Sequence, residues 1–66
     1  MATSDDYHPC YVIYPDGATH RATVRAKLMP IEDARDALMR GRQAWVAEDD
    51  ASQVVAWWND HRARHV

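Results

Sequence analysis

The segment from His20 to Leu28 constrains the fold more than any other part of the chain. Apolar residues occupy every second position, and basic or hydroxyl residues stand between them. A period of two is typical of a β-strand with one buried face and one exposed face. The residues predicted to face the core are Ala22, Val24, Ala26 and Leu28, and those predicted to face solvent are Arg21, Thr23, Arg25 and Lys27.

A turn signal precedes this strand. In Pro15-Asp16-Gly17, proline presets φ at the first turn position and glycine accepts a positive φ. The preceding Cys10–Tyr14 segment is dense in aromatic and β-branched residues, which favour strands. We therefore expect a β-hairpin from about Cys10 to Leu28.

Two further segments are predicted to be helical. The first begins near Pro30, which suits the first helical turn, and ends near Gly41 as the C′ residue. The second covers Asp49–His65, with Asp50 as the N-cap and Gln53 completing a capping box. Between them, 43–47 is predicted to be a third strand.

These elements predict an α+β fold of the order β-β-α-β-α. We expect a small two-layer sandwich, in which both helices cover one face of a three-stranded sheet. A right-handed crossover would make the third strand parallel to the second, although its pairing partner stays open. Residues 1–6 are predicted to be a flexible polar tail and 7–66 a single domain. The predicted core residues are Val24, Leu28, Ile31, Leu38, Val54 and Trp58.

The length and the single cysteine limit how the fold can be stabilised. A domain of 66 residues buries only about 60% of its unfolded surface, so its stability is expected to be marginal. Cys10 has no partner for an internal disulfide, which favours a reducing, cytoplasmic location. No apolar run reaches membrane-spanning length, and the first residues do not form a signal peptide.

Catalysis is the function class that the sequence favours least. Cys10, a histidine and Asn59 or Asp60 are the residue types of a thiol site, but nothing in the sequence brings them together. No glycine-rich phosphate loop is present, and no cofactor is expected. His61 and His65 have the spacing of two zinc ligands on a helix, with His8 and Cys10 as further candidates. Capping and solvation explain these residues better, so we expect no enzyme and no metal.

The basic residues suggest one binding function. Six of the eight Lys and Arg residues fall between Arg21 and Arg42. On an open sheet face beside aromatic side chains, the ladder from Arg21 to Lys27 would suit single-stranded nucleic acid. The sequence pI of about 6.0 argues against this alternative.

The aromatic residues favour a second binding function. Three Trp and three Tyr occur without any Phe, and Trp57 lies about 100° away from the apolar helix face formed around Val54 and Trp58. Trp, Tyr and Arg are enriched in interface hot spots. We therefore expect a non-catalytic module that regulates or inhibits by docking onto a larger protein or a nucleic-acid-handling complex, as compact phage or mobile-element inhibitors do, or that pairs with a second copy. The predicted partner-binding residues are Trp57, Arg21, Arg25, Lys27, Tyr11 and Tyr14.

Overall fold

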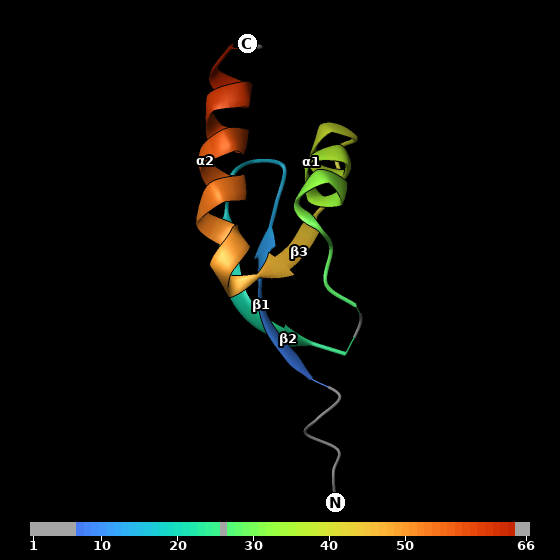
Figure 1. Cartoon of the computed structure of the whole chain (residues 1–66). Coiled ribbons are helices and arrows are strands. Elements are labelled where there is room, and N and C mark those ends of the chain that lie inside the picture. Colours follow the sequence, from blue (N-terminus) through green and yellow to red (C-terminus); the bar gives the residue numbers. More distant parts are fainter. Residues whose placement is uncertain (1–6, 26, 65–66) are drawn as a thin grey trace, which may run out of the picture.

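The computed structural model describes residues 7–25 and 27–64. Its elements follow the predicted β-β-α-β-α order (Figure 1). They are β1 (His8–Ile13), β2 (Thr19–Val24), α1 (Ile31–Met39), β3 (Ala44–Ala47) and α2 (Glu48–Arg64). The predicted tail at 1–6 and the helix end at His65 lie outside the described residues.

The sheet has the strand order β2-β1-β3, so β1 is the central strand. It pairs antiparallel with both neighbours. This arrangement decides the pairing that the sequence left open, because β3 pairs with β1. It also makes β3 parallel in direction to β2, as the crossover rule predicts.

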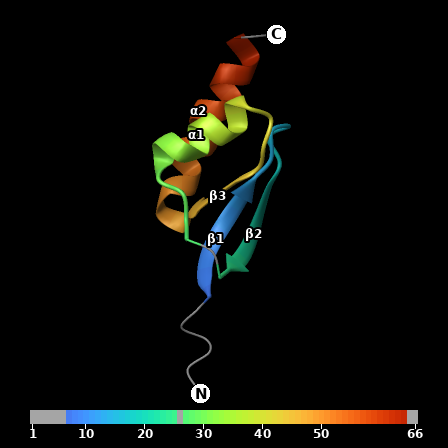
Figure 2. The same cartoon turned by 90° about the vertical axis from the view of Figure 1, so that its right-hand side faces the viewer.

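Both helices lie on the same face of the sheet, as expected (Figure 2). Helix α2 packs on β1 and β3, whereas α1 packs on β3 and on α2. Their contact with the sheet forms one apolar cluster, made of Ile13, Ala34, Ala37, Leu38, Ala44, Val46, Ala51, Val54 and Trp58. Strand β2 contributes no residue to this cluster, so the helices cover only part of the sheet.

The core differs from the prediction at one end of the hairpin. Leu38, Val54 and Trp58 are buried as expected, and Ile31 packs half-buried against the cluster. Val24 and Leu28 are only half-buried and do not belong to it, so that part of the prediction is wrong. Strand β2 ends at Val24, and its register with β1 places Val24 on the face of the sheet away from the helices, while Leu28 lies past the end of the strand.

The orientation of β2 also reverses the prediction. Tyr11 pairs with Arg21 on one side and with the core residue Val46 on the other. Residues paired across a sheet project from the same face, so Arg21 lies on the helix-covered face. Its Nη2 lies 2.8 Å from Oε2 of Glu48, the first residue of α2. Arg21 and Thr23, which were predicted for the open face, therefore lie on the opposite face, while Arg25 and Lys27 lie past the end of β2.

The hairpin turn is held against α2. Gly17 has a φ of 96°, and its N–H donates to the Tyr14 carbonyl at 2.8 Å. The Trp58 indole N–H donates to the Pro15 carbonyl at 2.8 Å. A side chain at Gly17 would collide with the guanidinium of Arg62 on α2. Glycine is thus favoured here for its positive φ, while the Arg62 guanidinium, as the end of a flexible side chain, could move aside for a Cβ.

Helix α1 ends as the sequence predicts. Gly41 has a φ of 78°, and its N–H donates to the Leu38 carbonyl at 3.0 Å. The Arg42 N–H donates to the Ala37 carbonyl at 2.9 Å, which completes a Schellman motif.

Helix α2 begins earlier than predicted. It starts at Glu48, directly after β3, so Asp50 lies in its first turn and is not the N-cap. Because no loop separates the two elements, Glu48, Asp49 and Asp50 all lie near the positive end of the helix dipole, where carboxylates are favoured.

We predict that Trp58→Phe lowers the free energy of unfolding by about 2 kcal/mol, because it removes buried ring volume and leaves the Pro15 carbonyl without its donor. Urea-induced unfolding measures this change. Trp45→Phe is the matched control, because its indole donates to the Lys27 carbonyl at an exposed site. It should cost less than about 1 kcal/mol. Equal costs for the two variants would contradict the anchoring role of Trp58.

Candidate functional site

The predicted partner-binding residues do not form a single site. Trp57 is half-buried and packs against the core cluster. The guanidinium carbon of Arg35, on α1, lies 5.0 Å from its ring centroid. The His61 ring stacks on it with a centroid distance of 5.2 Å. Trp57 is therefore partly exposed and also in contact with side chains of both helices.

Tyr11 and Arg21 lie together on the helix-covered face. Tyr11 is half-buried against the core cluster and lines a shallow pocket of about 320 Å³ beside the start of α2. Arg21 stands at the margin of this region, where its Nε also donates to Glu48 at 2.9 Å. The side chains of this exposed ion pair are 71% and 35% accessible, so it contributes at most about 1 kcal/mol to stability.

Arg25, Lys27 and Tyr14 lie elsewhere. The guanidinium carbon of Arg25 is 5.4 Å from the ring centroid of Tyr7, just past the end of β2. Lys27 is exposed, and its carbonyl accepts the Trp45 indole N–H at 3.1 Å. Tyr14 follows β1 and meets the ring of His20 edge-on, with centroids 5.5 Å apart. The basic side chains thus do not form a continuous ladder on one surface.

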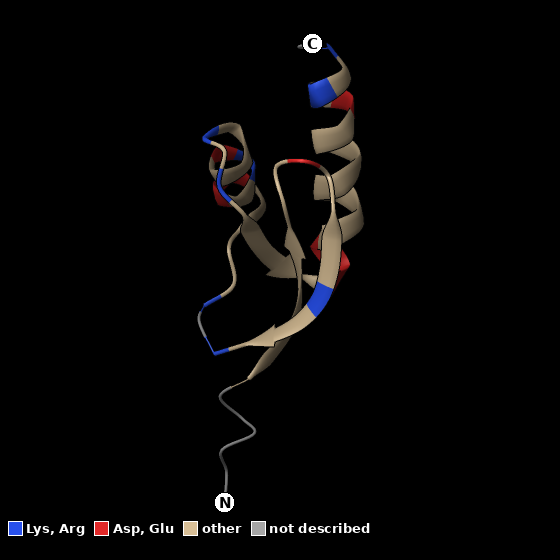
Figure 3. Cartoon of the chain, turned by 180° about the vertical axis from the view of Figure 1, so that it is seen from behind, with Lys and Arg blue, Asp and Glu red and all other residues tan. Residues whose placement is uncertain are grey.

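The sheet face opposite the helices, here called the open face, is the most distinctive surface. The strand register places on it His8, Cys10, Val12, His20, Ala22, Val24, Trp45 and Ala47. None of these residues is Asp, Glu, Lys or Arg. Arg21 is the one charged residue in the strands, and the register places it on the other face. The strands in Figure 3 are otherwise tan.

The open face is mainly apolar, although exposed His8 and His20 also lie on it. Cys10 is completely buried, whereas Val12, Ala22, Val24 and Trp45 are half-buried. Burial raises the pKa of the Cys10 thiol, and the negative charge of Glu48 raises it further. Both effects favour the protonated thiol, which is the less nucleophilic form of cysteine.

Val12 and Trp45 were not among the partner-binding residues predicted from the sequence. The available signal was that β1 and β3 are apolar on both sides of the strand, as Trp45 beside Val46 shows. That pattern predicts an apolar surface on whichever face the helices leave uncovered.

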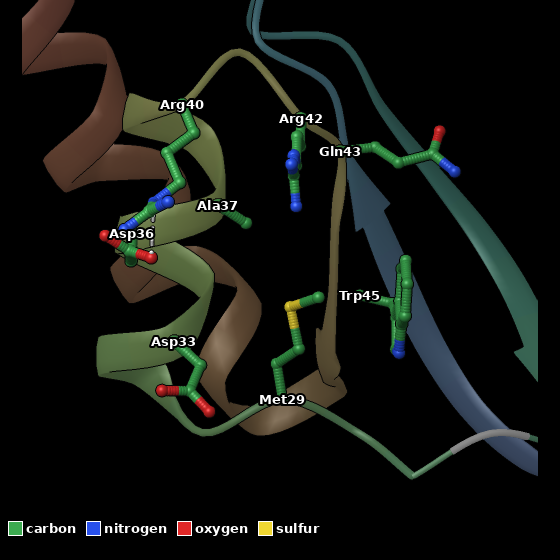
Figure 4. A pocket seen from close by; sticks show the side chains of 8 residues that line it. All are labelled: Met29, Asp33, Asp36, Ala37, Arg40, Arg42, Gln43 and Trp45. Carbon is green, nitrogen blue, oxygen red and sulfur yellow. Dashed lines mark ion pairs between the residues drawn. The ribbon is translucent and has the colours of Figure 1, made fainter.

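A cleft adjoins the open face between α1 and the outer edge of β3 (Figure 4). Its volume is about 430 Å³, and its lining residues are Met29, Asp33, Asp36, Ala37, Arg40, Arg42, Gln43 and Trp45. Asp36 Oδ2 pairs with Arg40 Nε at 2.9 Å, one helical turn apart. Trp45 belongs both to this cleft and to the open face.

The candidate metal ligands are not gathered by the fold. Within 7–25 and 27–64, no group of three or more His, Cys, Asp or Glu residues is placed to hold a metal ion. His61 stacks against Trp57 and Trp58 in α2, at the end of the molecule opposite the start of β1, where His8 lies (Figure 1). His65 lies outside the described residues.

Comparison with known proteins gives no relative: no family model, no curated protein and no solved structure matches this chain. In the part of the chain that the structure describes, no helix combines the length and apolar character needed to span a membrane.

We predict that iodoacetamide alkylates Cys10 in the folded protein at least about tenfold more slowly than in the urea-unfolded chain, because burial restricts access and the raised pKa keeps the thiol protonated. Mass spectrometry at pH 8 follows the reaction. Similar rates in both states would show that the centre of the open face is readily accessible.

Proposed function

We propose that this protein is a small non-catalytic module that docks onto a larger protein through the open face of its sheet. The observation that carries this proposal is the absence of charge from that face, combined with half-buried Val12, Val24 and Trp45. A solvent-facing side of an antiparallel sheet is ordinarily polar. An apolar, uncharged face is instead suited to being covered.

Binding to such a face is favourable because few costs oppose it. Removing apolar surface from water contributes about 25 cal/mol per Å². The strand positions of the open face hold no Asp, Glu, Lys or Arg, so binding does not have to remove such a charge from water, which costs several kcal/mol per ion when the charge stays unpaired. The aromatic ring of Trp45 supplies the type of residue that anchors interface hot spots.

The size of the face favours a larger partner over a second copy. Strands about 4.8 Å apart and about 20 Å long give the open face a footprint of roughly 300 Å². A standard stable interface buries about 800 Å² per partner. Two copies stacked face to face would fall well short of this area, whereas a larger protein can extend past the sheet edges. Occupying a site on such a partner is how a module of this kind regulates or inhibits.

The nucleic-acid alternative depended on a ladder of basic side chains on the open face. Arg21 faces the helices and pairs with Glu48, while Arg25 and Lys27 lie beyond the end of β2. The strand positions of the open face therefore include no Lys or Arg to contact a nucleic-acid backbone, although Lys27 lies close to them, since its carbonyl accepts the Trp45 indole N–H.

We predict that a charge on the open face abolishes partner binding. Affinity capture from the source cell's lysate compares Ala22→Glu with Thr23→Glu, its neighbour on the opposite face of β2. Ala22→Glu should lose the captured protein, because it buries an unpaired carboxylate in the interface. Thr23→Glu should keep it.

Circular dichroism and thermal melts must show that both variants fold. Trp57→Ala is run in parallel, because Trp57 is the anchor that the sequence predicted. If Trp57→Ala loses the partner and Ala22→Glu keeps it, the interface lies on the helices and the proposal is wrong.

We also predict that the isolated protein is a monomer at micromolar concentrations, since the open face is too small to hold a dimer by itself. Size-exclusion chromatography with light scattering measures the mass directly. A stable dimer that Ala22→Glu converts to monomer would assign the open face to a second copy instead.

A further inference from the structure

We propose that the cleft between α1 and β3 binds a carboxylate carried on an apolar group. This inference deepens the proposed function, because the cleft would receive an acidic group from the partner docked on the open face. It rests on the proposed function only for the identity of that partner, since the cleft can be tested alone with small molecules.

The shape of the cleft suits an apolar group. Its volume of about 430 Å³ lies within the usual range for ligand sites, about 300–1,000 Å³. Ala37 of α1 lines one side and Trp45 of β3 the other, with Met29 between them (Figure 4). The Trp45 indole is held in place by its hydrogen bond to the Lys27 carbonyl.

The charges of the cleft make Arg42 its available cation. Asp36 and Arg40 pair with each other on the surface of α1. In the described part of the chain, Arg42 has no ion-pair partner. Figure 4 shows its guanidinium projecting into the space between Ala37 and Trp45. A guanidinium in such a position binds a carboxylate through two parallel hydrogen bonds.

The backbone fixes where Arg42 stands. The Schellman motif at the end of α1 places the Arg42 N–H on the Ala37 carbonyl, 2.9 Å away. The same motif depends on the positive φ of Gly41. The backbone of Arg42 is thus fixed at the margin of the cleft, and its guanidinium extends from there into the cleft.

The cleft and the open face are continuous at Trp45, which lines both surfaces. A partner seated on the open face needs additional contact area, and the cleft is the adjoining hollow. An acidic residue or a chain end of that partner could extend past Trp45 into the cleft and contact Arg42 there.

Nuclear magnetic resonance titration of the full chain tests the cleft. The probe is N-acetylphenylalanine, with N-acetylphenylalanine amide as the uncharged control and phenethylamine as the cationic one. The acid should shift the indole N–H signal of Trp45, identified by its loss in Trp45→Phe, and the amide should bind at least tenfold more weakly. Arg42→Gln should weaken binding of the acid at least tenfold, whereas Arg25→Gln should leave it unchanged.

Two outcomes would overturn the inference. Equal affinities for N-acetylphenylalanine and its amide would show that Arg42 does not bind the carboxylate. Preferential binding of phenethylamine would assign the cleft to cations through Asp33. Titration with 3-phenylpropionate shows whether the carboxylate comes from a peptide chain end or from a free acid. If 3-phenylpropionate binds more weakly than N-acetylphenylalanine, the ligand is a chain end; if it binds more tightly, the ligand is a free acid.

Failure of this inference is separable from failure of the proposed function. The Ala22→Glu variant changes the open face and should still bind N-acetylphenylalanine in the cleft. Arg42→Gln leaves the open face intact, so it should reduce capture of the partner without abolishing it. Loss of both properties in Ala22→Glu would indicate a folding defect, which Val24→Lys on the same face then tests with the same two readouts.

Discussion

The contact between Trp58 and the hairpin turn is the interaction on which the rest of the structure depends. Four of the nine cluster residues are alanines, so this core has little apolar volume apart from the Trp58 ring. The same side chain satisfies the Pro15 carbonyl and so ties the last helix to the first turn. A core this small makes each such contact a large share of the total stability, which is only a few kcal/mol in domains of this size.

The position of α2 then determines which surfaces remain available. With α2 over β1 and β3, and α1 over β3, the edge strand β2 has no helix above it. Arg21 and Glu48 meet at this margin. On the opposite side no helix packs, the strand positions carry no Asp, Glu, Lys or Arg, and the face ends at Trp45 beside the α1–β3 cleft. Both proposed binding surfaces thus result from two short helices covering one side of the sheet.

The proposed function follows from the small size of the domain. The chain has enough apolar residues for two sheet faces, but only enough helix to cover one. In a larger domain a second layer would cover the other face. Here a partner would supply that layer, and recognition would come from Trp45 and from the unpaired Arg42 of the cleft. The module would then gain stability and specificity from the same contact.

The sequence alone determined the elements, because their signals are local. Gly17 and Gly41 predicted the turn and the helix end correctly, since each needs a positive φ that other residues avoid. The tertiary structure decided which side of β2 faces the helices. A period of two separates a strand's side chains into two sets, but the set that is covered depends on where distant helices cross the sheet. Arg21 was therefore placed on the wrong face, and Trp45 was not singled out for the open face, because strand order and helix position are long-range properties of the fold.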